Sequence, residues 1–407
     1  MAYKTSPAGG IATAPAQPSP QTTAPTARRL VGVDLARGLA VLGMFTVHAG
    51  PEPAATGALA PLVEATYGRS SALFALLAGF TLVLMTGRPE PRTGRPGRQA
   101  VARVLIRAAV LFVLGVALVA FGTQVDVILA YYALLFVFVL PFYRLRAASL
   151  AVAAAATALV LPQVLYLVKL AIDGGSWSDT LIAADPLAGL TDSDGVLDLL
   201  FTGPYPVLTW IPFLLAGMAV AKLDLSQAVV RARLALTGVG LAVLGYGGSW
   251  LALHLVPGAY AAVAANTDGD SPSSAWWSET VGEPTDNFRE WLLVGAPHSQ
   301  TTPSIVGATG VALAVLAGCL VAVDRLPRFR RLATPVTAVG MVSLSAYVLH
   351  IVAIRAVWKE DLPGSWAELF LFFAATMLFA VVWTRLFRRG PLEYVLHTAA
   401  KPARFIR

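Results

Sequence analysis

Three ionisable residues, Asp34, Arg37 and His48, lie within one otherwise apolar stretch that begins near Leu30. At about 100° per residue, they fall within roughly 60° of one another on one helix face. An ionisable group in hydrocarbon is costly unless it is paired or faces a polar cavity. We therefore predict that Asp34 and Arg37, one turn apart, form a structural ion pair. His48 lies about 21 Å further along the helix axis, so it needs a separate explanation.

Histidine side chains are the main candidates for catalysis in this sequence, because imidazole acts as a general base near neutral pH. We predict catalytic roles for His298 and His48. His298 lies in the segment GAPHSQTTPS, where the hydroxyls of Ser299 and Thr301 could orient an acceptor. The alternative for His298 is a polar loop in which the histidine caps a helix or binds a neighbouring backbone group.

Polar residues near the ends of other apolar stretches are candidates for substrate binding. An arginine such as Arg69 could bind a phosphate or a carboxylate, or could merely anchor the end of its helix. Tyrosines near a membrane interface are also expected as belt residues, and a histidine among apolar residues can be a hydrogen-bonded core residue. The predicted substrate-binding residues are Arg69, Ser70, Asp126, Tyr131, Ser299, Thr301 and His350.

The sequence predicts no metal site, because it has no histidine pair at i and i+4 and no histidine–carboxylate cluster at ligand spacing. The single cysteine, Cys319, excludes an intrachain disulfide and a cysteine-ligated metal. Walker and Rossmann glycine signatures are absent, so we do not expect nucleotide hydrolysis. The sequence also lacks a Gly-x-Ser-x-Gly nucleophile elbow. We expect no bound cofactor.

The composition is that of a polytopic membrane protein with an all-α fold. Of the 407 residues, 57% are hydrophobic and only 13% are charged, whereas soluble domains carry about 25% charged residues. A helix needs about 20 apolar residues to cross a bilayer. The sequence contains ten such stretches, near residues 30–49, 69–87, 104–122, 125–143, 148–170, 199–221, 234–256, 304–323, 335–357 and 366–386.

The charged residues predict the orientation of these ten helices. Every even-numbered connection is rich in arginine, whereas acidic residues concentrate in the long connections near 171–198 and 257–303. Basic loops mark the cytoplasmic side, so we predict that both termini are cytoplasmic and that His48, His298 and His350 lie toward the outer face. The net charge of +7 follows from this bias and from contact with anionic membrane lipids. It requires no nucleic-acid partner.

The two ends of the chain differ from the membrane domain, which we predict to extend over residues 28–396. Residues 1–27 are rich in proline, alanine and threonine and contain no apolar run, which indicates a disordered cytoplasmic tail. Residues 397–407 are predicted to form a basic cytoplasmic tail. The alanine-, arginine- and glycine-rich composition suggests a bacterial source, and hence a multi-pass protein of a bacterial plasma membrane.

Several segments together resemble a known family. The pattern RLxxxDxxRGxA (29–40), followed by a histidine at position 48, resembles the first helix of the heparan-α-glucosaminide N-acetyltransferase-like membrane proteins. Three later segments resemble their bacterial relatives that carry the domain of unknown function 418. These segments are GAPHSQTTPSIVGATGVALAV (295–315), VGMVSLSAYVLHIVAIR (339–355) and RRGPLEYVL (388–396).

The resemblance implies a membrane acyltransferase that uses cytosolic acyl-CoA, such as acetyl-CoA, as co-substrate and a small-molecule acceptor at the outer face. It implies that His298 or His48 acts as base or acyl carrier, and that Arg69 and Arg37 engage anionic parts of the donor or acceptor. One departure is that the animal enzyme has an essential histidine between its first two helices. The connection 49–71 of this chain contains none, and His48 stands where that enzyme has an asparagine.

Two further functions stay open alongside the acyltransferase. Asp34, Arg37 and Asp126 would also suit a substrate or proton pathway in a transporter for a small polar metabolite. A non-catalytic relative of the family is the third hypothesis, favoured by the missing histidine. The sequence leaves the oligomeric state open, with a homodimer as one option.

Overall fold

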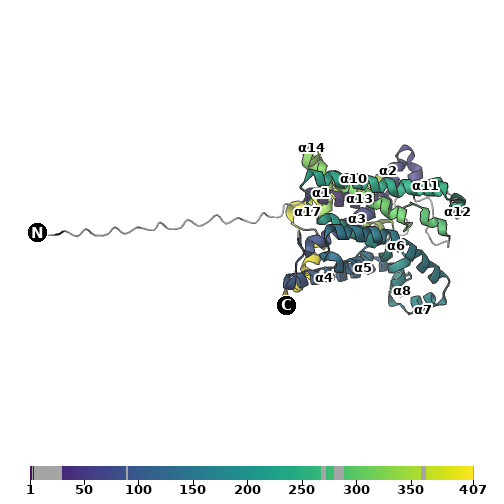
Figure 1. Cartoon of the computed structure of the whole chain (residues 1–407), viewed down its shortest axis with the longest axis horizontal. Helices are drawn as coiled ribbons and strands as arrows, with labels where there is room; N and C mark the ends of the chain where they lie inside the picture. Colours follow the sequence, from purple (N-terminus) through teal and green to yellow (C-terminus); the bar gives the residue numbers. More distant parts are fainter. Residues whose placement is uncertain are drawn as a thin grey trace. The chain divides into compact units, whose positions relative to one another are not determined.

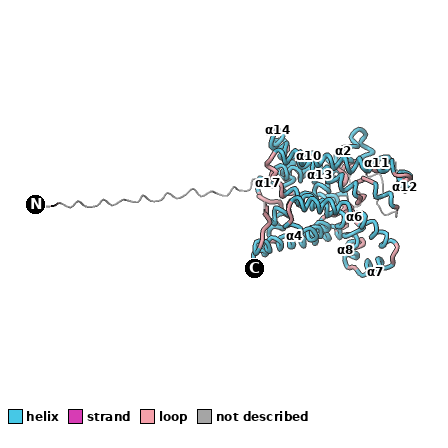
Figure 2. Tube along the Cα trace, viewed as in Figure 1, coloured by secondary structure: helices cyan, strands magenta, loops and turns pink. Residues whose placement is uncertain are grey.

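The computed structural model describes residues 30–88, 90–266, 272–278, 288–358 and 364–406, together with Met1 and Tyr3. The chain divides into two units, Met1–Leu30 and Val31–Arg407. The predicted tail 1–27 lies outside the described residues except for Met1 and Tyr3. Every described helix lies in the second unit, and none of the described residues forms a strand (Figure 2). The expected all-α fold is therefore confirmed.

Helices of very different lengths make up this unit. The longer ones are α1 (Val31–Ala49), α3 (Arg69–Thr86), α4 (Gly94–Ala120), α5 (Leu129–Val139), α6 (Ala147–Asp173), α9 (Val207–Ala221), α10 (Ala228–Ala242), α13 (Thr302–Arg325), α16 (Ser343–Trp358) and α17 (Trp366–Leu386). The shorter ones are α2 (Ala60–Glu64), α7 (Ser176–Ala184), α8 (Pro186–Thr191), α11 (Gly248–Leu255), α12 (Ala259–Ala265), α14 (Pro327–Leu332), α15 (Thr334–Met341) and α18 (Pro391–Ala399). Single 3₁₀ or π turns are η1 (Pro53–Leu59), η2 (Leu140–Arg144), η3 (Asp198–Thr202), η4 (Val243–Gly247), η5 (Pro272–Ser274), η6 (Arg289–Leu293) and η7 (Lys401–Phe405).

The protein is a multi-pass membrane protein. Among the described residues, seven helices are long and apolar enough to cross a membrane, or eight if α15 and α16, bent by 88°, count as one span. Each of the ten predicted stretches contains a helix, but two of these helices, Leu129–Arg144 and Val207–Ala221, are shorter. The second starts late because Pro204 and Pro206 precede it, and proline breaks a helix. The count of ten crossings thus stays a prediction.

Close backbone contacts join the helices around α1. A Cβ atom added to Gly38 would lie 2.0 Å from the carbonyl oxygen of Val336, and one added to Gly340 would lie 1.8 Å from that of Asp34. Helices α1 and α15 therefore touch backbone to backbone, which only glycine permits. Elsewhere, α4 packs along α5 and α10 along α13 (Figure 1).

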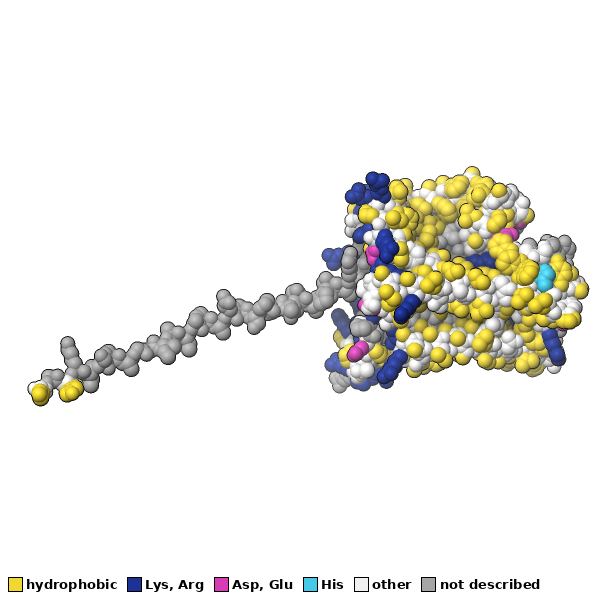
Figure 3. All heavy atoms as spheres, turned by 45° about the horizontal axis from the view of Figure 1, so that its top comes forward, with side chains coloured by type: hydrophobic (Ala, Val, Ile, Leu, Met, Phe, Trp, Pro, Cys, Tyr) yellow, Lys and Arg dark blue, Asp and Glu magenta, His cyan; other side chains and the backbone are white. Residues whose placement is uncertain are grey.

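Charged residues separate the two ends of the bundle. Lys and Arg side chains gather at the end where α14 and the C-terminus lie (Figures 1 and 3). We call this the basic end. Helix α1 runs away from it and ends at Ala49, just after His48. We call the opposite end, which carries His48, the histidine end.

Candidate functional site

Two histidines from opposite parts of the chain meet at the histidine end. His48 closes α1, and its Nδ1 lies 3.0 Å from Nε2 of His350 on α16. The two rings are parallel, with an interplanar angle of 3° and centroids 5.3 Å apart. His350 is only 2% exposed and packs against Phe45. The sequence singled out both histidines but not their contact, because 302 residues separate them.

The hydrogen bonds of this pair assign its tautomers. Nδ1 of His350 is bonded to the carbonyl oxygen of Tyr347, and a carbonyl can only accept. Nδ1 of His350 therefore carries its proton, and its Nε2 accepts the Nδ1–H of His48. This leaves the Nε2 of His48 with a free lone pair. A base held by a second oriented group is the arrangement used in nucleophilic and general-base catalysis.

His298 lies in a loop whose backbone is strained. Its φ is +57° and that of Gln300 is +60°, a region that residues other than glycine rarely adopt. Nδ1 of His298 donates to the carbonyl oxygen of Pro204 at 3.2 Å, so its Nε2 is also left as the acceptor nitrogen. Gln300 holds the loop: its Oε1 accepts from Thr209 Oγ1 at 2.8 Å and from Trp210 Nε1 at 3.2 Å.

Gln300 was not among the predicted site residues. Its Nε2 donates to the same Pro204 carbonyl oxygen at 3.1 Å, so one carbonyl fixes both His298 and Gln300. The sequence signal that could have indicated Gln300 is a polar side chain in a segment that packs against a neighbouring helix, because a buried amide needs hydrogen-bond partners. Strained backbone held by such bonds is typical of functional sites.

The predicted hydroxyls of this segment bind its own backbone. Ser299 Oγ donates to the carbonyl oxygen of Ala296 at 2.7 Å. Thr301 caps α13 by accepting from the backbone N–H of Ser304 at 3.3 Å, and it also donates to the carbonyl oxygen of Val294. Both hydroxyls therefore shape the loop that carries His298. Their predicted role in binding substrate stays a prediction.

Arg69 is enclosed by protein groups. Its Nε donates to the hydroxyl of Tyr246 at 2.9 Å, and its other nitrogens donate to the carbonyl oxygens of Glu64, Tyr67 and Trp277. The guanidinium also stacks on the ring of Tyr246. This geometry suits the anchoring alternative, while anion binding by Arg69 stays a prediction. The neighbouring Ser70 packs closely against Gly43 of α1, since a Cβ added to Gly43 would lie 2.1 Å from Ser70 Oγ.

A cavity of about 210 Å³ is lined by Pro204, whose carbonyl oxygen accepts from His298. Asp126 and Tyr131 line it together with Asp198, whose Oδ2 accepts from the hydroxyl of Tyr131 at 2.5 Å. Asp126 is exposed and interacts electrostatically with His298, which in turn interacts with His48. A second cavity, of about 20 Å³, lies between Arg69 and His298.

Five of the predicted residues thus gather at the histidine end. They are His48, His350, His298, Asp126 and Tyr131. Another histidine, His254, is exposed on α11 and bonds the carbonyl oxygen of Trp250 of its own helix at 2.7 Å. No group of three or more potential metal-ligating side chains occurs within the described part of the chain.

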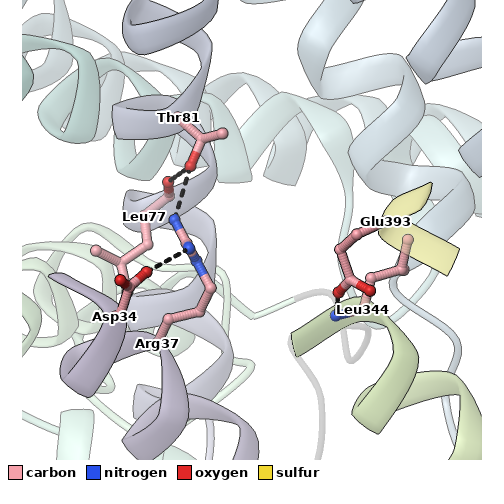
Figure 4. Close-up of polar contacts among 6 residues, drawn as sticks. All are labelled: Asp34, Arg37, Leu77, Thr81, Leu344 and Glu393. Atoms are coloured by element: carbon pink, nitrogen blue, oxygen red, sulfur yellow. Dashed lines mark hydrogen bonds and ion pairs between the residues drawn. The ribbon is translucent and has the colours of Figure 1, made fainter. Parts of the chain in front are cut away.

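Asp34 and Arg37 lie apart from this cluster, near the start of α1 (Figure 4). Arg37 Nη1 is 3.4 Å from Asp34 Oδ1, the geometry of an ion pair one turn apart. Arg37 Nη2 also donates to Thr81 Oγ1 of α3 at 2.9 Å, and Thr81 donates to the carbonyl oxygen of Leu77. The ion pair therefore also ties α1 to α3.

These features define a multi-pass helical membrane protein with a paired-histidine site at one end of its bundle. The family described as heparan-alpha-glucosaminide N-acetyltransferase, catalytic, matches residues 29–247. Since this match covers more than half of the chain, the protein belongs to that family. The family described as protein of unknown function (DUF418) matches residues 284–402, so the resemblance noted from the motifs is confirmed for both regions. No curated protein matches the chain.

The two matched regions contribute different parts of the site. His48 and Asp126 lie in the first region, whereas His298 and His350 lie in the second. The hydrogen bond between His48 and His350 therefore joins the two. Residues of both matched regions therefore form the candidate site.

Proposed function

We propose that this protein is an integral membrane acyltransferase that moves an acyl group from acyl-CoA to a small-molecule acceptor. The family supports the reaction class. The observation that carries the proposal for this chain is the His48–His350–Tyr347 series, which leaves a lone pair on Nε2 of His48. That series supplies a base on a chain that lacks a histidine between its first two helices.

In the proposed reaction, an acceptor hydroxyl or amine attacks the thioester carbonyl of the acyl-CoA. Nε2 of His48 takes the acceptor proton while the new oxygen–carbon or nitrogen–carbon bond forms. The carbon–sulfur bond then breaks, and the proton passes from His48 to the departing CoA sulfur. His350 keeps the imidazole of His48 in the required tautomer and orientation throughout.

The acceptor would occupy the cavity lined by Asp126, Tyr131 and Pro204, and His298, which donates to Pro204, interacts electrostatically with both Asp126 and His48. The basic end would face the cytoplasm and the acyl-CoA, following the positive-inside rule. We further propose that the ten apolar stretches all cross a bacterial plasma membrane, with both termini in the cytoplasm. The histidine end would then lie on the extracytoplasmic side.

A coupled assay tests this proposal on the purified protein in vesicles. Acetyl-CoA and longer acyl-CoAs are supplied with a panel of amine and hydroxyl acceptors, and release of the free CoA thiol is measured. We expect acceptor-dependent release that falls by about 100-fold or more in His48→Gln, because general-base catalysis contributes about 10²–10⁴-fold. His298→Gln should also lose activity, and both variants should melt near the wild type.

The matched control is His254→Gln, which removes an exposed histidine that bonds only its own helix. It should keep wild-type activity. Saturable thermal stabilisation by an acyl-CoA is a second readout, because a ligand that binds the native state raises its melting temperature. Thiol release that is unchanged in His48→Gln would contradict the proposed base.

A transporter is the second candidate function, and the break between α15 and α16 favours it. The two helices meet at 88° near Val342, and transporters build substrate sites from such interrupted helices. Vesicles that accumulate a polar metabolite without releasing CoA thiol would support this function and contradict the acyltransferase.

A further inference from the structure

A polar contact at the basic end joins the C-terminal helix α18 to the broken pair α15–α16. Glu393 of α18 accepts from the backbone N–H of Leu344 at 2.8 Å (Figure 4) and from the backbone N–H of Ser345 at 3.3 Å. Ser345 Oγ donates to Glu393 at 2.5 Å and accepts from the backbone N–H of Leu392 at 3.0 Å. Each helix thus caps the N-terminus of the other. The carboxylate of Glu393 thus accepts three hydrogen bonds from the start of α16.

The same region carries several cations on α4. Three arginines, Arg95, Arg103 and Arg107, and the neutral Gln99 lie at intervals of four residues and so share one face of that helix. This face meets the C-terminal segment, because Gln99 Nε2 donates to the carbonyl oxygens of Arg404 and Ile406 at 2.9 and 3.1 Å. Helix α4 also contacts α18 and η7.

Arg107 is the unusual member of this face. It lies well inside the apolar part of α4, where an ionisable side chain indicates a function. Its Nη1 donates to the thioether sulfur of Met85 of α3 at 2.9 Å. Arg107 interacts electrostatically with Arg389 and Glu393. Glu393 therefore lies close to Arg107, while it accepts its three hydrogen bonds from α16.

Two more cations of the cluster, Arg389 and Lys401, belong to the C-terminal segment. His397 on α18 is exposed, and its pKa is lowered from the usual value by slight desolvation and by the charges of Arg389, Lys401, Arg107 and Arg103. Within the described residues, none of the four cations Arg103, Arg107, Arg389 and Lys401 forms an ion pair. Like charges held this close repel one another unless an anion lies between them.

We propose that Arg103, Arg107, Arg389 and Lys401 form a binding site for a phosphate group at the basic end. Arginine suits this ligand because its guanidinium pairs with phosphate oxygens through two parallel hydrogen bonds. A phosphate, whether monoester or diester, brings negative charge and at least two free oxygens, which several guanidinium groups can share. The phosphate belongs either to the nucleotide of CoA, in which case the site rests on the proposed function, or to an anionic lipid headgroup.

Binding measurements on the full-length protein in neutral detergent test the site. The probes are adenosine 3′,5′-bisphosphate, which represents the nucleotide of CoA, and short-chain phosphatidylglycerol. Adenosine and short-chain phosphatidylcholine are their controls. We expect at least one phosphate probe to bind saturably and each control to bind at least tenfold more weakly.

Single variants then locate the site. Arg107→Gln should weaken binding roughly fivefold or more, the effect of about one basic residue near a phosphate. Lys401→Gln changes an exposed residue and should weaken phosphate binding similarly. This variant keeps the test valid if the Arg107 variant fails to fold. Arg328→Gln, an exposed arginine on α14 at the same end, is the matched control and should bind like the wild type.

The outcomes separate this inference from the proposed function. Binding of the bisphosphate identifies a donor subsite, and binding of phosphatidylglycerol identifies a lipid site; either supports the proposal. If neither probe binds, or if Arg107→Gln and Lys401→Gln bind as Arg328→Gln does, the phosphate site is wrong. Thiol release in the transfer assay would still be measurable on the same protein, so the acyltransferase proposal would stand or fall by itself.

Discussion

Replacing Glu393 with alanine should destabilise the protein strongly, although Glu393 lies on a short helix near the C-terminus. The substitution removes three hydrogen bonds, from Leu344 N–H, Ser345 N–H and Ser345 Oγ–H. It also removes the negative charge that stabilises the positive N-terminal end of α16, worth about 0.3–1 kcal/mol. A buried donor left without an acceptor costs about 1–3 kcal/mol, and water replaces part of that loss at a half-buried site. We expect a total of about 2–4 kcal/mol.

The comparison with a second glutamate makes this measurement decisive. Glu368 accepts from the backbone N–H groups of Gly364 and Ser365 and from Ser365 Oγ in the exposed capping box of its own helix α17. It also accepts one part-buried hydrogen bond from Nε1 of Trp358 on α16, at 2.8 Å, so Glu368→Ala removes that bond as well as the cap. Loss of an exposed cap costs about 1 kcal/mol. Unfolding would be followed in mixed detergent with increasing sodium dodecyl sulfate, by far-UV circular dichroism. If Glu393→Ala unfolds at the same detergent fraction as Glu368→Ala, the cap between α16 and α18 does not stabilise the fold.

The partner Ser345 supplies an internal check. Glu393→Ala and Ser345→Ala should be non-additive, with a coupling of about 0.5–3 kcal/mol for residues in contact. Additive effects would show that the two side chains act independently and would contradict the reciprocal cap.

Three further substitutions test other contacts by the same unfolding assay. Arg37→Ala should cost about 1–3 kcal/mol, because it removes the ion pair with Asp34 and the hydrogen bond to Thr81 of α3; a variant that melts like the wild type would refute the stabilising ion pair. Gly340→Ala should cost about 1–3 kcal/mol, because its Cβ would lie 1.8 Å from a backbone oxygen of α1. Its control is Gly318→Ala, which should be near neutral because nothing lies within 4 Å of the added Cβ. Arg69→Lys should cost about 1–3 kcal/mol, because lysine cannot reproduce four hydrogen bonds from one planar group; an unchanged unfolding midpoint would favour a ligand-binding role for Arg69 over anchoring.

Local apolar runs and charge were sufficient to predict much of the fold from the sequence. Each run of about 20 apolar residues contains a helix, because helices satisfy their own backbone hydrogen bonds in a membrane. The gathering of Lys and Arg at one end was likewise visible in the loop sequences. The ion pair of Asp34 and Arg37 follows from their spacing alone, since the geometry of one helix places them together.

The break between α15 and α16 was not predictable in this way. Residues 335–357 read as one continuous apolar stretch, whose only proline, Pro335, is its first residue, seven positions before the bend. The bend at Val342 depends on Glu393, which satisfies the first N–H groups of α16 from 48–49 residues further along the chain. A helix start that is capped by a distant residue leaves no local signal.

The candidate site was predicted as a set of residues but not as an arrangement. His48 and His350 were both expected near the outer face, yet their pairing and their tautomers depend on the packing of α1 against α16. The strained conformation of His298 and Gln300 depends on Pro204 and the polar groups of α9. Spacing along one chain carries no information about such contacts.

The long separation between His48 and His350 also bears on how the protein is made. The N-terminus of a chain is synthesised first, so His48 has no His350 to pair with until 302 further residues have been made. Residue 393 follows later still, and only then can α16 receive its cap. The paired histidines are therefore completed among the last events of biogenesis, and a ribosome-bound intermediate would hold membrane-inserted helices with an incomplete histidine pair.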